Sequence, residues 1–562
     1  MKTKVNVCLV GLLFYGLTAF AGINDKGIEY YSAGMLETAR LYFLEQTGEA
    51  PADKAEAYYY LGLIYDQLGQ KNEVSEYFQK AFEIAPPTAY GYICKGKLEL
   101  EKGSTKDILK VADDMFKKAQ NLAKKDASIS VKVAEAYYAK GLTTQAQAAL
   151  EKARKINMNY SGIYMLEGEQ LLKENNLGRA MSNFEMALMF NDKDKISYLK
   201  LAQVYNNINR KDLALEYLNK VLLLDPNFVP AHVLFGDIKH SQAQYKDAIK
   251  AYEKAIAVPG APLEVYEHYA QSLFFDKQFD KSISQIQYVL SKDPNNAVMH
   301  RLEAYNDYEL GNYEAGLKKM EQFLSSVSKD RHIYLDYLTM AQYYEQMKQY
   351  SKAIEYYKIA LEADSTKTDL YKTMAADALS DKKYEEAISY FEKYFEVNPK
   401  YLSTDIYSYA DACLNASAEY LSKYDANATP EQAEANEASF NLFIEKVIKA
   451  DTELIEKVPE SYLGYYGRAK AYALKDAFQQ KKTEKMSGIA KPYYEEALVY
   501  LLKGNDDGRM NRYILEAYNY LFISAYTVED KAGIIENSKK ILEYDPQNEN
   551  AKQALDFYKV KY

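Results

Sequence analysis

The chain has 562 residues, and its 80 Asp and Glu outnumber its 70 Lys and Arg, which gives a formal net charge of −10. The two signs are interspersed and no basic cluster stands out, so the composition argues against a nucleic-acid-binding protein and against docking on an anionic membrane surface. Only 13 prolines occur and no long segment alternates apolar and polar residues, so we expect helices rather than strands.

The first 21 residues have the pattern of a secretory signal peptide. Lys2 and Lys4 precede a mostly apolar run, Val5–Phe20, and the run ends in the triplet 19–21, which has alanine at both ends. A charged start, a short apolar stretch and a small-residue cleavage site define such signals, so we predict cleavage before Gly22. The alternative is an uncleaved membrane anchor, although the run is short for a membrane span.

A repeat with a spacing close to 34 residues follows this segment. Small residues stand 34 residues apart at five successive places, Gly168, Ala202, Gly236, Ala270 and Ala304. Around each of them apolar residues fall at intervals of three and four, which predicts two amphipathic helices per repeat. We expect this small residue, called here the crossing residue, where the two helices pass closest. Further crossing residues are predicted at Gly27, Gly62, Gly96, Ala134, Ala341, Ala375 and Ala410.

The second helix of each repeat has a pattern of its own. A large aromatic residue is expected to fill the space beside the crossing residue, at Phe78, Phe184, Tyr252, Tyr357 and Phe391. Proline then ends the helix, because it lacks an N–H group and disfavours the helical conformation in the residue before it. These prolines are Pro86, Pro226, Pro294, Pro399 and Pro546.

This frame of aromatic, small and proline positions resembles the tetratricopeptide repeat, a helix–turn–helix unit. The resemblance implies an all-α, right-handed α-solenoid of about 14 helix pairs, irregular in the C-terminal third. We predict a signal peptide at 1–21, a regular repeat array at 22–410, an irregular helical region with insertions at 411–510, and a degenerate C-terminal repeat and cap at 511–562. The short signal, high tyrosine content and Asn- and Lys-rich helices resemble exported bacterial proteins of the Bacteroidota type.

In proteins of this family the first helices of successive repeats line a concave groove that binds extended protein segments. The resemblance places these residues in the groove: Tyr59, Leu63, Tyr138, Met165, Gln203, Asn206, Asp237, His240, Gln271, Phe274, Phe275, Tyr305, Tyr308 and Gln342. The strongest partner contacts in the groove are expected at four aromatic residues, Phe274, Phe275, Tyr305 and Tyr308. The alternative is that some of these side chains pack against the facing helix. The Lys/Asn/Arg clamp of the family's chaperone-tail binders is absent.

We find no catalytic, cofactor-binding or metal-ligating residues in the sequence. There is no P-loop, no dinucleotide-type glycine turn, no His-Glu-x-x-His and no Cys-x-x-Cys. All five histidines lie between His232 and His332, but His240 and His268 fall on different helices, so no metal site is predicted. We therefore predict that the protein is not an enzyme and has no cofactor.

The predicted function is a non-catalytic protein–protein interaction scaffold of the bacterial cell envelope, in the periplasm or on the periplasmic face of the outer membrane. Cys94 and Cys413 lie about nine repeats apart and are expected to stay unpaired, which suits a periplasmic protein. The expected partners are one or more envelope proteins, with no nucleic acid, at most peripheral membrane contact and no small-molecule ligand. Two alternatives stay open: a glycan-binding or uptake accessory protein at the outer membrane, and an enzyme with an unrecognised site in 410–500. The inserted region 414–500 competes with the groove as the docking site.

Overall fold

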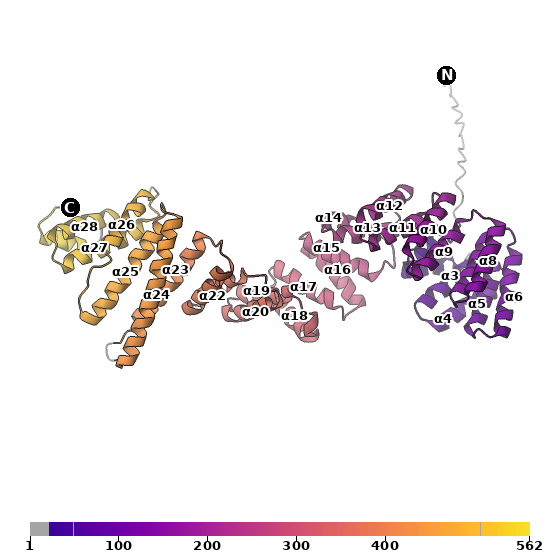
Figure 1. The fold of residues 1–562 in the computed structure, drawn as a ribbon, viewed down its shortest axis with the longest axis horizontal. Helices are drawn as coiled ribbons and strands as arrows, with labels where there is room; N and C mark the ends of the chain where they lie inside the picture. The colour runs from indigo at the N-terminus through magenta and orange to yellow at the C-terminus, as the bar shows by residue number, and fades with distance from the viewer. Residues whose placement is uncertain (1–21, 49, 426–427, 506, 562) are drawn as a thin grey trace, which may run out of the picture. The chain divides into compact units, whose positions relative to one another are not determined.

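The computed structural model describes residues 22–48, 50–425, 428–505 and 507–561. The predicted signal peptide lies outside these residues. The described chain is all-α and has no strand (Figure 1). None of the helices in these ranges combines the length and the apolar character that crossing a membrane requires.

The chain divides into two compact units between Asn306 and Asp307, inside helix α17 (Ala297–Glu309), and each unit is described by itself. The other helices of the first unit are α1 (Asp25–Ser32), α2 (Leu36–Glu45), α3 (Pro51–Gln67), α4 (Lys71–Phe82), α5 (Ala89–Glu101), α6 (Lys106–Leu122), α7 (Ala127–Tyr138), α8 (Thr143–Ile156), α9 (Ser161–Lys173), α10 (Leu177–Phe190), α11 (Lys195–Asn207), α12 (Lys211–Leu224), α13 (Val229–Ser241), α14 (Tyr245–Ala255), α15 (Leu263–Phe275) and α16 (Phe279–Lys292), with a short 3-10 turn η1 (Gln46–Gly48).

The second unit begins in α17 and continues to the end of the chain. Its helices are α18 (Tyr313–Ser326), α19 (Tyr334–Gln346), α20 (Tyr350–Ala363), α21 (Leu370–Ser380), α22 (Tyr384–Val397), α23 (Ser403–Ser422), α24 (Pro430–Lys457), α25 (Tyr462–Thr483), α26 (Lys491–Lys503), α27 (Asn511–Thr527), α28 (Lys531–Tyr544) and α29 (Glu549–Phe557), with a second 3-10 turn η2 (Lys329–Arg331).

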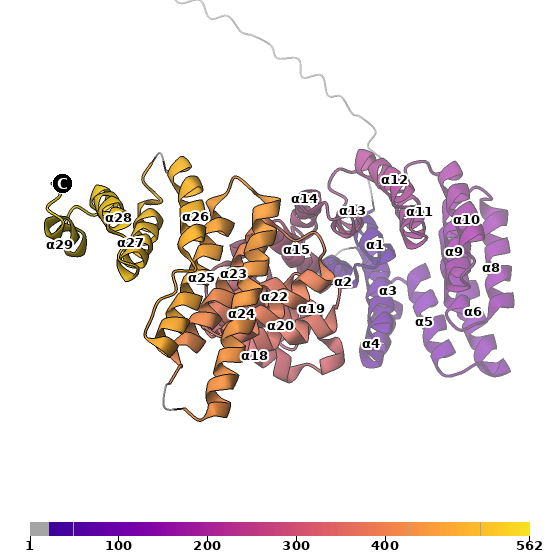
Figure 2. The ribbon, with the colours of Figure 1, turned by 60° about the vertical axis from the view of Figure 1, so that its left-hand side comes forward.

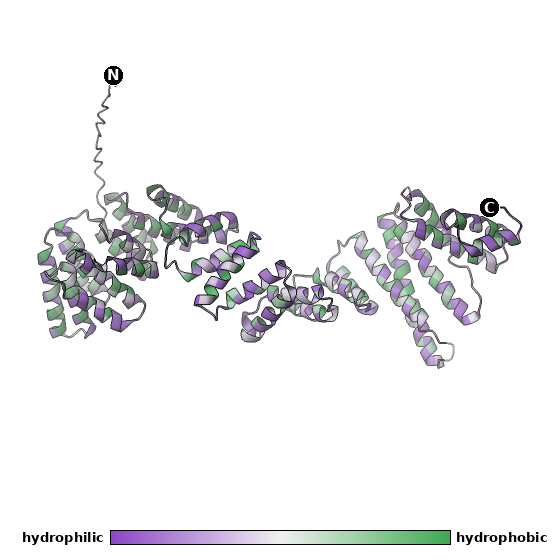
Figure 3. Ribbon diagram, turned by 180° about the vertical axis from the view of Figure 1, so that it is seen from behind, coloured by the Kyte–Doolittle hydropathy of each residue, from purple (hydrophilic) through white to green (hydrophobic). Residues whose placement is uncertain are grey.

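In the described part of the chain, consecutive helices pack as pairs, from α1 with α2 to α15 with α16 in the first unit and from α19 with α20 to α27 with α28 in the second, and α29 follows as a last single helix. The predicted all-α solenoid is therefore confirmed. Within the first unit several odd-numbered helices also contact the next odd-numbered helix, for example α3 with α5, α5 with α7 and α13 with α15, so the first helices of these pairs lie side by side in a layer. Figure 3 shows hydrophobic and hydrophilic residues on the same helices, as expected for amphipathic helices that bury one face.

The predicted crossing residues lie where the paired helices approach each other most closely. A Cβ atom placed on Gly168 would lie 2.5 Å from the Phe184 ring, and one on Gly27 would lie 2.8 Å from the Phe43 ring. Both distances are shorter than van der Waals contact, so only glycine fits at these two crossings. The aromatic rings fill the space that the missing side chain leaves, and this packing holds the pair together.

The predicted prolines stand just past the helices that they end. Pro226 comes two residues after Leu224 at the end of α12, and Pro399 comes two residues after Val397 at the end of α22. The longest described helix is α24, with 28 residues, and its neighbours α23 and α25 have 20 and 22. Helices α24 and α25 fall in the segment 411–510 that was predicted to be irregular, and α23 begins before it. The domain boundaries proposed from the sequence stay predictions.

The first unit closes on itself through contacts between its first pair and much later helices. Thr38 Oγ1 donates a hydrogen bond of 2.8 Å to the carbonyl of Gly260, which lies in the loop after α14. Lys195 Nζ, on α11, lies 2.8 Å from Glu29 Oε1 on α1 and 3.0 Å from Asp225 Oδ2. Figure 2 shows α1 close to α12 and α13. The first pair therefore bounds the concave side of this unit.

Candidate protein-binding groove

The concave side of the first unit contains a groove of about 750 Å³, called here the N-terminal groove. Its lining residues come from α1, α3, α5, α7, α9 and α11 and from the turns beside them. These are the first helices of six successive pairs, so the groove follows the layer that the repeat builds. A surface built by several successive repeats suits an extended polypeptide segment.

The floor of the groove carries two lysines. Lys132 Nζ lies 2.9 Å from Glu135 Oε2 and 5.1 Å from the centre of the Tyr60 ring. Lys97 is only 6% exposed, and its ammonium group has no hydrogen bond or ion pair to any described residue. Burial lowers the pKa of Lys97, because removal from water penalises the charged form. An acidic group from outside the chain could pair with Lys97.

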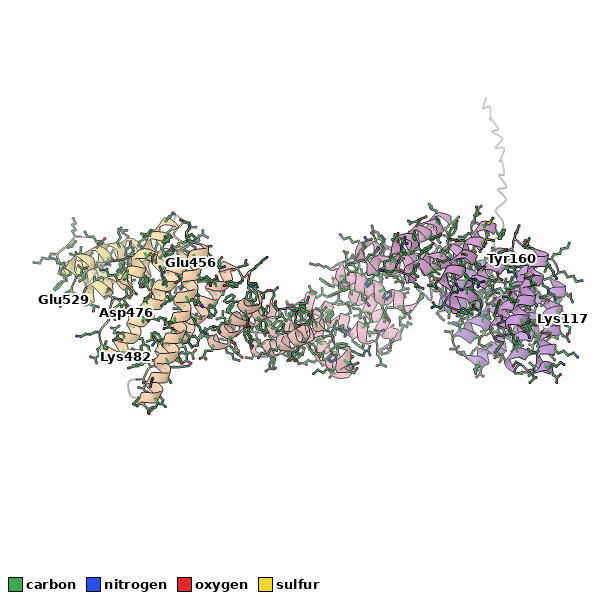
Figure 4. The ribbon with its side chains drawn as sticks, viewed as in Figure 1. Lys117, Tyr160, Glu456, Asp476, Lys482 and Glu529 are labelled. Carbon is green, nitrogen blue, oxygen red and sulfur yellow. The ribbon has the colours of Figure 1, made fainter. Side chains whose placement is uncertain are left out.

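The walls of the groove combine aromatic and charged side chains. Lys200 Nζ lies 3.3 Å from Glu169 Oε1 across two helices. The other charged lining residues are Asp66, Asp194 and Lys173, and the tyrosines of the lining are Tyr31, Tyr138 and Tyr160. Four lysines thus face four carboxylates, and the groove as a whole is not strongly acidic or basic. Tyrosines add rigid contact surface with a polar end. Figure 4 labels Tyr160 on this unit.

Three of the residues predicted for the groove line it, namely Leu63, Tyr138 and Met165. Tyr59 lies beneath the surface with 0% exposure, and its hydroxyl is 3.5 Å from Glu135 Oε2. The sequence analysis missed Lys97 and Glu135, which directly follow the crossing residues Gly96 and Ala134. Leu63, which was predicted for the groove, directly follows Gly62 in the same way. The position directly after the crossing residue, taken in every repeat, would therefore have identified both Lys97 and Glu135.

Asp237 and His240 form a separate cluster with residues of α15. His268 Nδ1 lies 2.9 Å from Asp237 Oδ1, and His240 Nδ1 lies 2.8 Å from Ser272 Oγ. The two imidazole rings are stacked, with their centres 5.8 Å apart. The hydrogen bond to Asp237 raises the pKa of His268, and burial lowers the pKa of His240. Among the described residues no group of three or more His, Cys, Asp or Glu side chains could hold a metal ion.

The remaining predicted residues lie at several depths. Phe275 is 49% exposed and stacks on Tyr245 with ring centres 4.8 Å apart, whereas Tyr305 is 6% exposed and packs against Phe274 at 6.1 Å. Tyr305 therefore offers little ring surface to a ligand. Gln203, Asn206 and Gln271 are half-buried in the first unit, and Tyr308 and Gln342 are half-buried in the second.

Five segments match the family described as "Tetratricopeptide repeat", at residues 55–88, 196–228, 229–259, 337–367 and 378–401. Two of them overlap α3 and α11, which line the N-terminal groove.

Two curated proteins and one solved structure illustrate the similarity. DnaJ homolog subfamily C member 3 of Gallus gallus is 23% identical over 476 residues, which cover 77% of this chain and 91% of that protein. Protein CTR9 homolog of Arabidopsis thaliana is 24% identical over 283 residues, 47% of this chain and 25% of that protein. The C-terminal part of a TPR repeat-containing protein from Cytophaga hutchinsonii is 24% identical, covers 51% of this chain and 99% of that structure, and has a TM-score of 0.37.

Proposed function

We propose that this chain, which carries tetratricopeptide repeats, is an interaction scaffold whose N-terminal groove binds an extended segment of a partner protein. Proteins built from these repeats serve as protein-interaction scaffolds. The groove supports this function because the first helices of six successive pairs line it with tyrosines and paired charges. Such a surface can contact a segment along its length, with backbone and side chains of either charge.

The observation on which this proposal rests is Lys97 on the floor of the groove, whose ammonium group makes no hydrogen bond or ion pair with the described residues and lies 5.6 Å from the centre of the Phe78 ring. A buried ammonium group without a partner is costly, and an acidic side chain or chain end in the groove would remove that cost. The segment is therefore proposed to place one carboxylate at Lys97, while its other residues contact the tyrosines and ion pairs of the walls.

The cellular setting is a further part of the proposal. The charged start, the apolar run and the small-residue triplet at 19–21 support export and cleavage before Gly22. We place the scaffold in the periplasm or on the periplasmic face of the outer membrane of a bacterium, without catalytic activity. Sequencing the N-terminus of protein purified from the envelope tests this setting, and an intact Met1 terminus would instead support the anchor.

Site-specific photo-cross-linking tests the groove itself. A benzoylphenylalanine at position 170, where Gln170 lines the groove, is expected to cross-link to one short segment of one partner. The same probe at position 117 is the control, because Lys117 lies on the exposed side of α6 (Figure 4). Cross-links of equal yield and identity from both positions, or none from position 170, would contradict groove binding.

A further inference from the structure

A second pocket lies entirely within the second unit, between α23, α24, α25 and α27, and is called here the C-terminal pocket. Its volume is about 180 Å³. Sites for drug-sized molecules usually have about 300–1,000 Å³, so this pocket has room for one side chain rather than for a cofactor. Its lining residues are Tyr407, Ala410, Asp411, Leu414, Val447, Asp451, Tyr462, Leu463, Tyr466, Gly467, Lys470, Arg512, Tyr513 and Glu516.

The least exposed ionisable group of this pocket is the carboxyl group of Asp451, and burial raises its pKa well above the usual value. The residue is 1% exposed, and Oδ2 is sealed from solvent without a hydrogen-bond partner. The carboxyl group rests on Gly467, where a Cβ atom would lie 2.7 Å from Oδ1. The absent side chain at position 467 therefore makes room for the acid at the edge of the pocket.

Two other buried aspartates of the same unit have hydrogen-bond donors, whereas Asp377 Oδ2, like Asp451 Oδ2, has none. Asp476, also 1% exposed, accepts hydrogen bonds from the backbone N–H groups of Ile489 and Ala490, at 3.2 and 3.1 Å (Figure 4). Asp405 accepts from the N–H of Leu402 at 3.0 Å. Asp451 has no comparable donor, although an unpartnered buried carboxyl group is costly. A donor supplied by a ligand would explain why this acid is kept.

Tyrosine rings surround the approach to Asp451. The ring centres of Tyr466 and Tyr513 lie 5.0 Å apart, and those of Tyr462 and Tyr513 lie 5.8 Å apart. The Lys470 ammonium already lies 5.7 Å from the centre of the Tyr466 ring. The negative faces of aromatic rings attract cations, so the walls favour a positively charged group.

The charged groups that face the pocket are mixed but include more acids than bases. Asp411 and Glu516 stand at the exposed rim beside Asp451, and Lys470 and Arg512 are the two bases of the lining. Lys470 lies over Tyr466 and makes no ion pair with Asp451 among the described residues. Arg468, outside the lining, pairs through Nη2 with Glu496 at 2.7 Å, while its buried Nε has no hydrogen-bond partner, and its charge lowers the pKa of Asp451 against the larger effect of burial. None of the described cations makes an ion pair with Asp451, and Asp451 lines the pocket, so a cation that enters the pocket can approach its carboxyl group.

We propose that the C-terminal pocket binds one basic side chain of a partner polypeptide, whose cationic end pairs with the Asp451 carboxylate between the tyrosine rings. The partner is thus a protein segment with an exposed lysine or arginine. This site lies wholly in the second unit, and its residues are independent of the N-terminal groove. It would give the scaffold a second contact point of opposite charge preference to Lys97.

Three capped tripeptides test the proposal on the full chain by saturation-transfer NMR: acetyl-Gly-Lys-Gly-amide and its analogues with norleucine and with glutamate in place of lysine. The lysine peptide should bind and the two analogues should not. Asp451→Asn should weaken that binding by about tenfold or more, as expected for a hydrogen bond to a charged group. Because no bond is lost in the free protein, Asp451→Asn should keep the wild-type melting temperature.

Two further variants separate the pocket from the rest of the unit. Glu437→Gln removes an exposed carboxylate of the same helix, 2.9 Å from Lys482 and outside the pocket, and should leave binding unchanged. Tyr407→Ala removes a wall residue that is 42% exposed and should weaken binding without unfolding the chain. The proposal is overturned if the glutamate peptide binds better than the lysine peptide, if no peptide binds, or if Asp451→Asn binds the lysine peptide as the wild type does.

Discussion

A Cβ atom placed on Gly236 would lie 2.5 Å from Cε1 of Tyr252, so α13 and α14 touch at a point where only glycine fits. Tyr252 is 0% exposed and donates a hydrogen bond of 2.8 Å from its hydroxyl to Asp237 Oδ1. The ring is enclosed by its neighbours and its hydroxyl is fixed by this hydrogen bond, so the ring cannot easily move away from an added methyl group. One crossing thus shows how a repeat of small and aromatic residues fixes the spacing of a helix pair.

Gly236→Ala should destabilise the first unit by about 1–3 kcal/mol, because a methyl group is forced into a filled space. Urea unfolding followed by circular dichroism measures this loss. Gly178→Ala is the matched control, since a Cβ atom there has no neighbour within 4 Å and Gly178 is exposed on α10. The control should be neutral or stabilising by up to about 1 kcal/mol. Equal losses in the two variants would contradict the crossing role of Gly236.

Ala243→Gly should stabilise the protein, because Ala243 ends α13 with φ of 56°, a left-handed conformation that suits glycine. A gain of about 1 kcal/mol is expected. Ala148→Gly, at an exposed position inside α8, is the control and should cost about 1 kcal/mol. Differential scanning calorimetry of both variants should show melting temperatures shifted in opposite directions. A loss of stability in Ala243→Gly would show that this turn is not strained.

Asp377 should make the second unit less stable as pH rises. Burial and then the nearby Glu345 raise the pKa of Asp377 to about 7, and its Oδ2 has no hydrogen-bond partner. The protonated Asp377 side chain has its full stabilising effect below the pKa of about 4 that an aspartate has in the unfolded chain. This effect is lost as the pH rises through the higher pKa of the folded protein. Asp377→Asn should therefore raise the melting temperature at pH 8 and change it little at pH 4.

Asp381→Asn provides the comparison, because a hydrogen bond from Ser351 lowers the pKa of Asp381. The ionised Asp381 stabilises the fold at neutral pH, and this contribution is lost on acidification. Asp381→Asn should therefore be less stable than the wild type at pH 8. If both variants respond to pH in the same direction, the assignment for Asp377 is wrong.

Local periodicity was enough to predict the helix pairs, the Gly168–Phe184 type of crossing and the prolines after α12 and α22, because each depends on residues within one repeat. It could not predict that α1 meets α11 and that Thr38 meets Gly260, because those contacts depend on the summed curvature of several repeats. The charged floor of the groove was missed for a simpler reason. Lys97 and Glu135 directly follow the crossing residues of their repeats, and this position was predicted to face the groove for Leu63 but not for these two residues.

The histidines illustrate the same limit. His240 and His268 lie 28 positions apart in the sequence and were predicted on different helices, which is correct. Their helices α13 and α15 are neighbours in the layer of first helices, and the two rings stack there. Adjacency within that layer, rather than distance along the chain, decides which residues of a repeat protein meet.

The central claim is that the N-terminal groove binds a partner segment through Lys97. The most direct measurement is the calorimetric affinity of the cross-linked segment, as a synthetic peptide, for the wild type, for Lys97→Met and for Lys117→Met. Loss of the charge pair should weaken the binding of the peptide to Lys97→Met by about tenfold or more. The variant should stay as stable as the wild type, because the free protein loses no hydrogen bond or ion pair. Lys117→Met should bind as the wild type does. Wild-type affinity in a folded Lys97→Met variant would contradict the account.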